Sequence, residues 1–249
     1  MARALTKILR CAVLLEILVP ASGFVEHLAL HGGLPTTARK ACGFRARRNG
    51  CFRASLAEEA ASYAQDGAAC PAVSKAGGTV ATFAGGCFWG LELAYQRQHG
   101  VLQTCVGYTQ GHKPFPTYAE VCAEETGHTE AVLLTYDETV VTYAQLAAIL
   151  FDRIPDPTML NRVGNDRGTQ YRHGMYAHSE QQLAEARAAF EVESKMWRTS
   201  GRAVVTEVAL ATAFWPAEEV HQQYLQKGGN YGMPQSAAKG ATEPIRCYG

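Results

Sequence analysis

Residues 85–90 read G-G-C-F-W-G and surround the thiol of Cys87 with glycines and two large aromatic side chains. The glycines allow a sharp turn and the close approach of another molecule. A helix starting here would direct unpaired backbone N–H groups and its positive dipole end at the sulfur, which favours the thiolate. Phe88 and Trp89 can supply an apolar wall beside it. The pattern favours a reactive cysteine, and a small thiol buried beneath a helix is the simpler alternative.

The spacing around Cys87 excludes two familiar thiol chemistries. A thiol–disulfide oxidoreductase would carry a second cysteine three residues later, where this chain has Gly90. A cysteine phosphatase would carry an arginine six residues later to bind the phosphate oxygens, and that position is Leu93. The eight cysteines contain no C-x-x-C pair, so their pattern is neither that of a zinc site nor that of a disulfide-rich scaffold.

Hydrophobic periodicity predicts the elements that must position this thiol. We expect a strand just before Cys87 and a helix that starts at it. Two later helices have Thr142 and Ser179 as expected N-caps, with Gln182 at the capping-box position of the second. The last helix should end at the glycines of 228–229. The predicted strands are 79–84, 101–109, 129–137, 170–177 and 203–210, and the predicted helices are 87–98, 142–154, 179–197 and 217–227.

The order strand–helix–strand–strand–helix–strand is the split βαβ pattern. It predicts an α/β fold, a two-layer sandwich with a ferredoxin-like βαββαβ core and a long C-terminal coil. The chain has 249 residues, 47% of them hydrophobic and 18% charged, and a formal net charge of zero. This composition suits one soluble domain with extensions and gives no basic field for nucleic acid. We expect a monomer, because nothing in the sequence demands more.

The first 77 residues differ in composition from the rest of the chain. Residues 1–23 have a short basic start, an apolar run interrupted by Glu16 and small residues at the end, which is typical of a signal peptide. A buried core helix is the alternative. Residues 24–77 begin as a basic, acid-poor, transit-like segment and end as a linker of Ala, Gly, Ser and Pro. They predict delivery to a plastid, with secretion as the alternative, ahead of a catalytic domain at 78–249 that keeps no membrane segment when mature.

Seven blocks of the sequence stand out between residue 86 and the last residue. They are GCFWG at 86–90, VGYTQG at 106–111, PTYAEVC at 116–122, TGHTEAV at 126–132, GNDRGTQYR at 164–172, HQQYL at 221–225 and IRCYG at 245–249. Together these blocks resemble the A-type methionine sulfoxide reductases, and the plant-type members most of all. The resemblance spans essentially all of residues 79–249 in family order, and the leader lies outside it.

The resemblance implies an enzyme that reduces the S epimer of methionine sulfoxide, free or in oxidised proteins, and so repairs them. It makes Cys87 the nucleophile that attacks the sulfoxide sulfur. It makes Glu130 the acid that gives a proton to the sulfoxide oxygen. A carboxyl group used in this way should lie in a poorly hydrated pocket that raises its pKa toward neutrality.

The same resemblance assigns five further site residues. Tyr118 and Tyr171 match tyrosines that donate hydrogen bonds to the sulfoxide oxygen, and Asp166 matches a pocket acid that orients its neighbours. Phe88 and Trp89 match the aromatic wall that receives the methyl group of the substrate.

Taken singly, most of these residues have simpler interpretations. Glu130 could be a solvated charge at a strand end, Tyr118 and Tyr171 half-buried tyrosines with satisfied hydroxyls, and Asp166 a turn former. Their joint match to one family is what favours the functional roles. His221 lies in a matching block as well, but we expect it to make a structural hydrogen bond and to have no catalytic role.

The implied reaction leaves Cys87 as a sulfenic acid, which a second thiol can convert to a disulfide. Cys247, in the IRCYG block, is the expected resolving cysteine, with a free surface thiol as the alternative. Plant-type members often carry another cysteine where this chain has Ala241, so we expect a single Cys87–Cys247 disulfide, with Cys122 as a backup. Thioredoxin is the implied reductant and partner, replaceable in vitro by dithiothreitol, and no metal or bound cofactor is needed.

A non-enzymatic alternative also fits the two thiols. A redox sensor could use Cys87 and Cys247 as a switch without any help from Glu130, Tyr118 and Tyr171. Turnover of the two sulfoxide epimers distinguishes the sensor from the enzyme.

Overall fold

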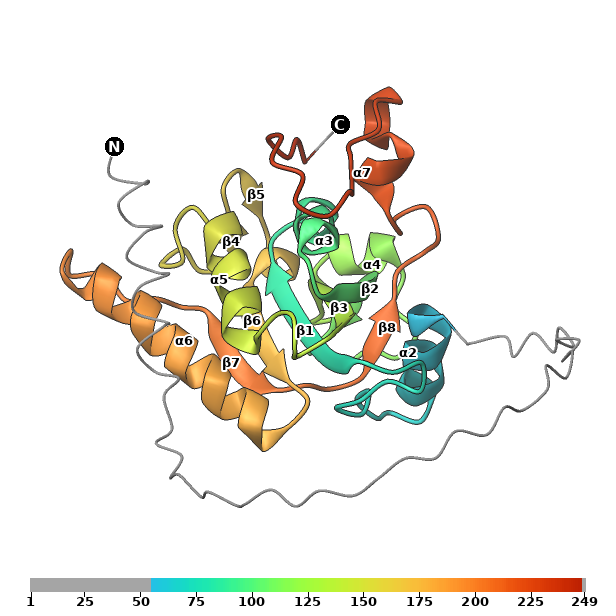
Figure 1. Ribbon diagram of the computed structural model, residues 1–249, viewed down its shortest axis with the longest axis horizontal. Helices are drawn as coiled ribbons and strands as arrows, with labels where there is room; N and C mark the ends of the chain where they lie inside the picture. The colour runs from blue at the N-terminus through green and yellow to red at the C-terminus, as the bar shows by residue number, and fades with distance from the viewer. Residues whose placement is uncertain (1–54, 248–249) are drawn as a thin grey trace, which may run out of the picture. The chain divides into compact units, whose positions relative to one another are not determined.

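The computed structural model describes residues 55–247 as an α/β domain built on a mixed sheet (Figure 1). The predicted signal peptide and the transit-like residues up to 54 lie outside the described residues. Within the described range, no helix combines the length and the apolar character needed to cross a membrane.

The main sheet has six strands in the order β7–β6–β1–β3–β2–β8. All neighbouring strands are antiparallel except β6 and β7, which run parallel. A two-stranded sheet, β4 with β5, stands beside it. The strands are β1 (Thr79–Gly85), β2 (Val101–Thr109), β3 (Thr129–Tyr136), β4 (Arg162–Val163), β5 (Asp166–Arg167), β6 (His173–Ala177), β7 (Glu207–Leu210) and β8 (Phe214–Pro216).

Three helices, α3, α5 and α6, pack on one face of the sheet, and α2 packs on the other. Helices α3, α5 and α6 share a core with the strands in which Phe83 stacks on Tyr95 at 5.2 Å between ring centroids. Two short helices and two 3₁₀ turns complete the chain. The helical elements are α2 (Leu56–Gln65), α3 (Phe88–Arg97), α4 (Tyr118–Cys122), α5 (Tyr143–Arg153), η1 (Thr169–Tyr171), α6 (Glu180–Arg198), α7 (Tyr224–Lys227) and η2 (Gly229–Tyr231).

The segment before β1 is folded, so the prediction of a flexible linker there is wrong. Ser55 and Glu58 form a reciprocal capping box that starts α2. Leu56 then enters a second core with Val80 and other residues on the far face of the sheet. The carboxylate of buried Glu59 accepts hydrogen bonds from the hydroxyl of Ser74 and a backbone N–H, which ties the following loop down. The two-layer sandwich therefore carries a partial third layer.

The capping predictions are confirmed in one helix and half confirmed in another. Thr142 caps α5 in a full capping box with Gln145. The Ser179 side chain accepts the N–H of Gln182 at the start of α6. The Gln182 side chain instead bonds to the backbone of His178 and of Val80, because the neighbouring strand offers it a buried carbonyl.

Of the last predicted helix, 217–227, only the final turn, α7 (Tyr224–Lys227), is helical. Two side chains and one backbone N–H before α7 bond to other elements, and these bonds replace the helical turn. The carboxylate of Glu218 accepts the backbone N–H of Tyr118. The side-chain amide of Gln222 accepts the backbone N–H of Val106 and donates to the backbone oxygen of the same residue. Gln223 adopts a left-handed φ of 54° and donates its N–H to the buried carboxylate of Glu92. The predicted strands 170–177 and 203–210 are likewise shorter, because η1 precedes β6 and because β7 begins only at residue 207.

Candidate active site

Cys87 lies between the end of β1 and the start of α3, at one end of the sheet. It is the N-cap residue of α3, as the sequence predicts, and its side chain is partly exposed. Gly86 before it has φ 77°, and a Cβ at this residue would lie 2.6 Å from the Cβ of Val163. Only glycine allows both this backbone conformation and the close packing of β4.

The thiol of Cys87 is held in its neutral form. Burial raises its pKa well above the ordinary value, and the neighbouring charge of Glu130 raises it further. The backbone N–H of Trp89 in the first turn of α3 acts in the opposite direction. The helix start therefore favours the thiolate as expected, but desolvation outweighs this effect.

Glu130 is a buried carboxyl group at the start of β3, with 1% of its surface exposed. Its Oε2 accepts the N–H of Phe88 at 3.0 Å, which joins it to the residue after Cys87. Burial raises the pKa of Glu130 to about 8, against the lowering effect of the Phe88 N–H and with a further rise from Asp166. This burial excludes the solvated edge charge and leaves an acid that keeps its proton at neutral pH.

Two tyrosines and Asp166 lie around the same carboxyl group of Glu130. Tyr118 is the first residue of α4, and Tyr171 is the last residue of η1. Burial and then Cys122, as a hydrogen-bond acceptor, raise the pKa of the Tyr118 hydroxyl; burial and then Glu130 raise that of Tyr171. Asp166, on β5, adds its charge to those acting on Cys87 and Glu130. The structure thus brings all of these predicted groups around one carboxyl group.

The aromatic residues after Cys87 form a cluster with His221. Phe88 is fully buried, and its ring centroid lies 5.5 Å from that of His221. Trp89 donates its indole N–H to Nδ1 of His221 at 3.3 Å and stacks on Tyr224 at 3.9 Å between centroids. Tyr118 packs on the other side of the imidazole at 4.5 Å. The expected structural hydrogen bond of His221 is confirmed, and it holds the wall together.

Glu218 fixes the helix that carries Tyr118. Its Oε1 accepts the backbone N–H of Tyr118 and its Oε2 the hydroxyl of Tyr108, each at 2.8 Å. Tyr108 pairs with Glu130 across the β2–β3 ladder. Glu218 therefore links α4 to the strands that carry the acid.

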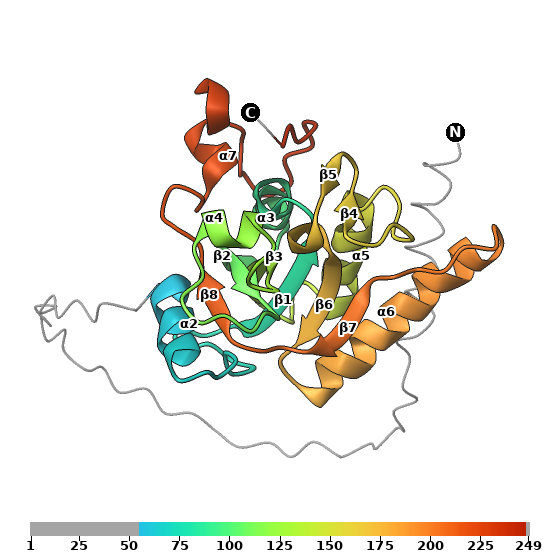
Figure 2. The ribbon, with the colours of Figure 1, turned by 180° about the vertical axis from the view of Figure 1, so that it is seen from behind.

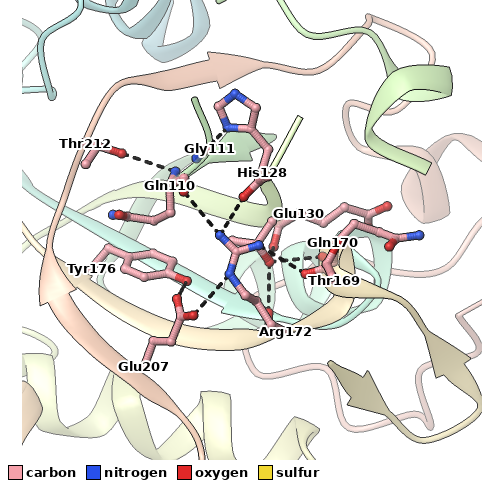
Figure 3. Close-up of polar contacts among 12 residues, drawn as sticks. Gln110, Gly111, His128, Glu130, Thr169, Gln170, Arg172, Tyr176, Glu207 and Thr212 are labelled. Carbon is pink, nitrogen blue, oxygen red and sulfur yellow. Dashed lines mark hydrogen bonds and ion pairs between the residues drawn. The ribbon is translucent and has the colours of Figure 1, made fainter. Parts of the chain in front are cut away.

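Arg172 fixes the turn that carries Tyr171, as Figure 3 shows. Its guanidinium group donates to the backbone oxygens of Thr169 at 3.1 Å and Gly127 at 2.9 Å, and it pairs with Glu207 at 3.2 Å. The hydroxyl of Thr129, beside Glu130 in β3, donates to the backbone oxygen of Arg172 at 2.9 Å. These bonds attach η1 to the strand end where the carboxyl group lies.

The two further thiols lie on different sides of the site. Cys247 has its Sγ at 3.4 Å from Nη2 of Arg153, close to the first turn of α3. Cys122 is exposed on α4, where it accepts a hydrogen bond from the hydroxyl of Tyr118. Neither is in a disulfide. Over residues 55–247 no group of three or more His, Cys, Asp or Glu side chains could hold a metal ion.

Comparison with known proteins identifies the family. The model of the family described as peptide methionine sulfoxide reductase matches residues 79–245. The chain belongs to this family. A peptide methionine sulfoxide reductase of Brassica napus is 50% identical over 177 residues, which cover 71% of this chain and 67% of that one. The A3 protein of Arabidopsis thaliana is 49% identical over 173 residues, which cover 70% and 84%.

Solved structures of methionine sulfoxide reductases share the fold. The enzyme of Corynebacterium diphtheriae aligns with a TM-score of 0.57 at 37% identity, over 59% of this chain and 74% of that one. Reduced Mxr1 of Saccharomyces cerevisiae aligns with a TM-score of 0.56 at 35% identity, over 62% and 88%. The present chain is thus an enzyme that reduces methionine sulfoxide to methionine.

Sequence reasoning about this reductase missed four residues that organise the site. Arg172 and Tyr224 lie inside the blocks GTQYR and HQQYL, so the sequence marked their neighbourhood without indicating what they contact. Tyr108 lies in the block VGYTQG in the same way, whereas Glu218 carries no local signal. The carboxylate of Glu218 and the hydroxyl of Tyr108 are far apart in sequence and meet only after β2 and the C-terminal segment have packed.

Proposed function

We propose that the chain reduces the S epimer of methionine sulfoxide, protein-bound or free, with Cys87 as nucleophile and Glu130 as acid. The observation that carries the proposal is the buried carboxyl group of Glu130, bonded to the N–H of Phe88 and with a pKa of about 8. Such a group can give a proton at neutral pH to an oxygen that must otherwise leave as an oxide. The stereochemical preference follows from the family resemblance.

The first step transfers the sulfoxide oxygen to Cys87. Glu130 protonates the oxygen while Tyr118 and Tyr171 donate hydrogen bonds to it. The sulfur of Cys87 attacks the sulfoxide sulfur, and the thiol proton passes to the carboxylate of Glu130. This attack forms a bond between the two sulfur atoms. The hydroxyl group then moves from the methionine sulfur to the Cys87 sulfur as the sulfur–sulfur bond breaks, which leaves methionine and the sulfenic acid of Cys87. Asp166 orients the acid, and Phe88 and Trp89 receive the methyl group.

The second step removes the sulfenic acid. The thiol of Cys247 forms a disulfide with Cys87, and the sulfenic oxygen leaves as water. Thioredoxin then reduces the disulfide and is the partner of the cycle, with dithiothreitol as its replacement in vitro. The position of Cys247 near the first turn of α3 supports this pairing over one with Cys122. We propose that the enzyme acts as a monomer without a bound cofactor.

Turnover of the two purified sulfoxide epimers with dithiothreitol tests the first step. We expect methionine from the S epimer alone and none from Cys87→Ser. Activity of Cys87→Ser would refute the nucleophile. Equal turnover of both epimers would refute the stereochemistry. Cys247→Ser should keep its activity with dithiothreitol and lose it with thioredoxin, and equal loss with both reductants would count against a resolving role.

The cellular location of the protein and the boundaries of its folded domain are proposals as well. We propose a plastid location through a signal peptide at 1–23 and a transit segment after it. An A4 relative from Arabidopsis thaliana, 48% identical over 177 residues, is named chloroplastic. Mass spectrometry of the native N-terminus tests this location, and a chain starting at Phe24 would contradict it.

Because α2 packs on the sheet, we place the start of the folded domain near Ser55 rather than at 78. The strand order β6–β1–β3–β2 supports a ferredoxin-like core.

A further inference from the structure

Cys247 has a defined seat on α3. Gly90 lies three residues after Cys87, on the same face of the helix. A Cβ added at Gly90 would lie 2.6 Å from Sγ of Cys247 and 2.9 Å from Nη2 of Arg153. The missing side chain of Gly90 is therefore the space that the second sulfur occupies.

Arg153 closes this seat from the end of α5. Its Nη2 donates a hydrogen bond to Sγ of Cys247 at 3.4 Å. Its Nε is buried and has no hydrogen-bond partner within the described part of the chain. A guanidinium group left incompletely paired in this way is costly unless the contact that it does make has a use.

Gln235 holds the backbone next to Cys247. Its Nε2 donates to the backbone oxygen of Arg246 at 2.7 Å, and its Oε1 accepts the backbone N–H of the same residue at 2.9 Å. Gln235 is itself nearly buried and donates its own N–H to the backbone oxygen of Leu225. The amide therefore fixes the residue before Cys247 relative to α7.

Arg97, at the end of α3, holds the rest of the tail. Its Nε donates to the backbone oxygen of Ser236 at 2.8 Å and its Nη1 to that of Glu243 at 2.6 Å. In turn the N–H of Gly240 donates to the backbone oxygen of Arg97. In Figures 1 and 2 the tail accordingly runs along the end of the molecule where α3 starts. The tail is thus a coil, as the sequence predicts, and these hydrogen bonds hold it against α3.

We propose that Arg153 and Gln235 are positioning residues of the recycling step, which hold the Cys247 sulfur at Gly90 before the Cys87 sulfenic acid forms. The inference rests on the proposed role of Cys247. The Cys247 sulfur bonds to the Cys87 sulfur, the bond between that sulfur and its hydroxyl breaks, and the hydroxyl leaves as water with the proton of the Cys247 thiol. A seated sulfur makes this step fast, because no loop must first be ordered.

A single-turnover experiment separates this step from methionine formation. Enzyme reduced in advance is mixed with one equivalent of the S sulfoxide without reductant. Methionine and the Cys87–Cys247 disulfide are then measured against time, and dimedone traps the sulfenic acid. We expect Arg153→Leu and Gln235→Leu to form methionine at the wild-type rate but the disulfide at least ~10-fold more slowly, with sulfenic acid accumulating. Arg153→Lys should restore part of the rate.

Two further variants make the test specific. Gly90→Ala should slow the disulfide as well, since its methyl group takes the place of the sulfur while alanine favours the helix. Arg187→Leu, an exposed arginine on α6, is the matched control and should change neither rate.

The outcomes distinguish this inference from the proposed function. Unchanged disulfide rates in folded Arg153→Leu, Gly90→Ala and Gln235→Leu would overturn the positioning role and leave Cys247 as the resolving cysteine. Failure of the wild type to form any Cys87–Cys247 disulfide would overturn the proposed role of Cys247 itself. Equal slowing of methionine formation and of the disulfide would also contradict the inference, because it would place Arg153 and Gln235 in the first step.

Discussion

At the scale of single residues, two groups of the site, the thiol of Cys87 and the carboxyl group of Glu130, are poorly solvated and keep their protons at neutral pH. Desolvation raises the pKa of both Cys87 and Glu130, and each would oppose the ionisation of the other. A neutral thiol and a neutral acid suit a substrate that carries no net charge at its sulfoxide. The pair can pass one proton to the oxygen and recover it from the thiol.

The protonation states of Cys87 and Glu130 predict the pH dependence of the first step. Glu130 is protonated below a pKa of about 8, so the single-turnover rate of methionine formation should stay level in the neutral range and fall above pH 8. Glu130→Gln should be slower by a factor of about 100 or more and should lack that falling limb. Quenched-flow measurement of methionine across pH 6–10 checks both. A wild-type rate that rises through pH 8 would contradict the role of Glu130.

The same burial has a cost in stability that can be measured. The folded pKa of Glu130 is about 8 against an ordinary 4.5, so the folded state binds the proton more tightly. The free energy of unfolding should therefore fall as the pH rises from 4.5 to 8. Glu130→Gln removes this penalty and should be more stable than the wild type above pH 8, on the order of a few kcal/mol. Urea unfolding at pH 5 and pH 8.5 tests this, and an advantage that is larger at pH 5 would refute it.

At the scale of elements, polar side chains hold in place the short helix and the 3₁₀ turn that carry the two tyrosines. Glu218 holds α4, and Arg172 holds η1. Neither short element has enough apolar surface to fix itself, because helices of one turn are not stable on their own. The hydroxyls of Tyr118 and Tyr171 are thus only as well placed as these two anchors.

The anchor of α4 can be tested without touching a reacting group. Glu218→Gln keeps one acceptor oxygen for the two donors that Glu218 now serves, so one bond to Tyr118 or Tyr108 is lost. We expect the rate of methionine formation to fall by about 10-fold, the equivalent of one hydrogen bond to a charged group. Glu219→Gln is the control, because the side chain of Glu219 is exposed and pairs with Lys227. Equal rates for the two variants would remove Glu218 from the list of positioning residues.

At the scale of the whole molecule, the domain depends on residues that precede the matched family region. The match starts at residue 79, yet Leu56 and its neighbours cover the far face of the sheet. A chain that starts at Ser55 should unfold at the same urea concentration as the full chain. A chain that starts at Thr79 should lose several kcal/mol, because the apolar residues beneath α2 become exposed. Equal midpoints for the two truncated chains would contradict the contribution of α2.

The sequence predicted what local patterns determine. The strand before Cys87, the helix after it and the cap at Thr142 depend on neighbours in the chain, and all three are found as predicted. The resemblance also selected the residues that converge on Glu130. The raised pKa of Cys87 was beyond the sequence, because it arises from burial by residues from several elements. The irregular backbone at Gln223 was missed for the same reason, since the carboxylate that holds it belongs to α3.

The pairing of β1 with β6 bears on how the chain reaches its active form. Gly85, two residues before Cys87, is opposite His173 in this ladder, and about half of the catalytic domain separates them in sequence. A contact between residues so distant closes late in folding, because the entropy of the intervening loop must be overcome before the contact forms. During synthesis, the strand pairing beside the turn that carries Cys87 can therefore be completed only after β6 has been made.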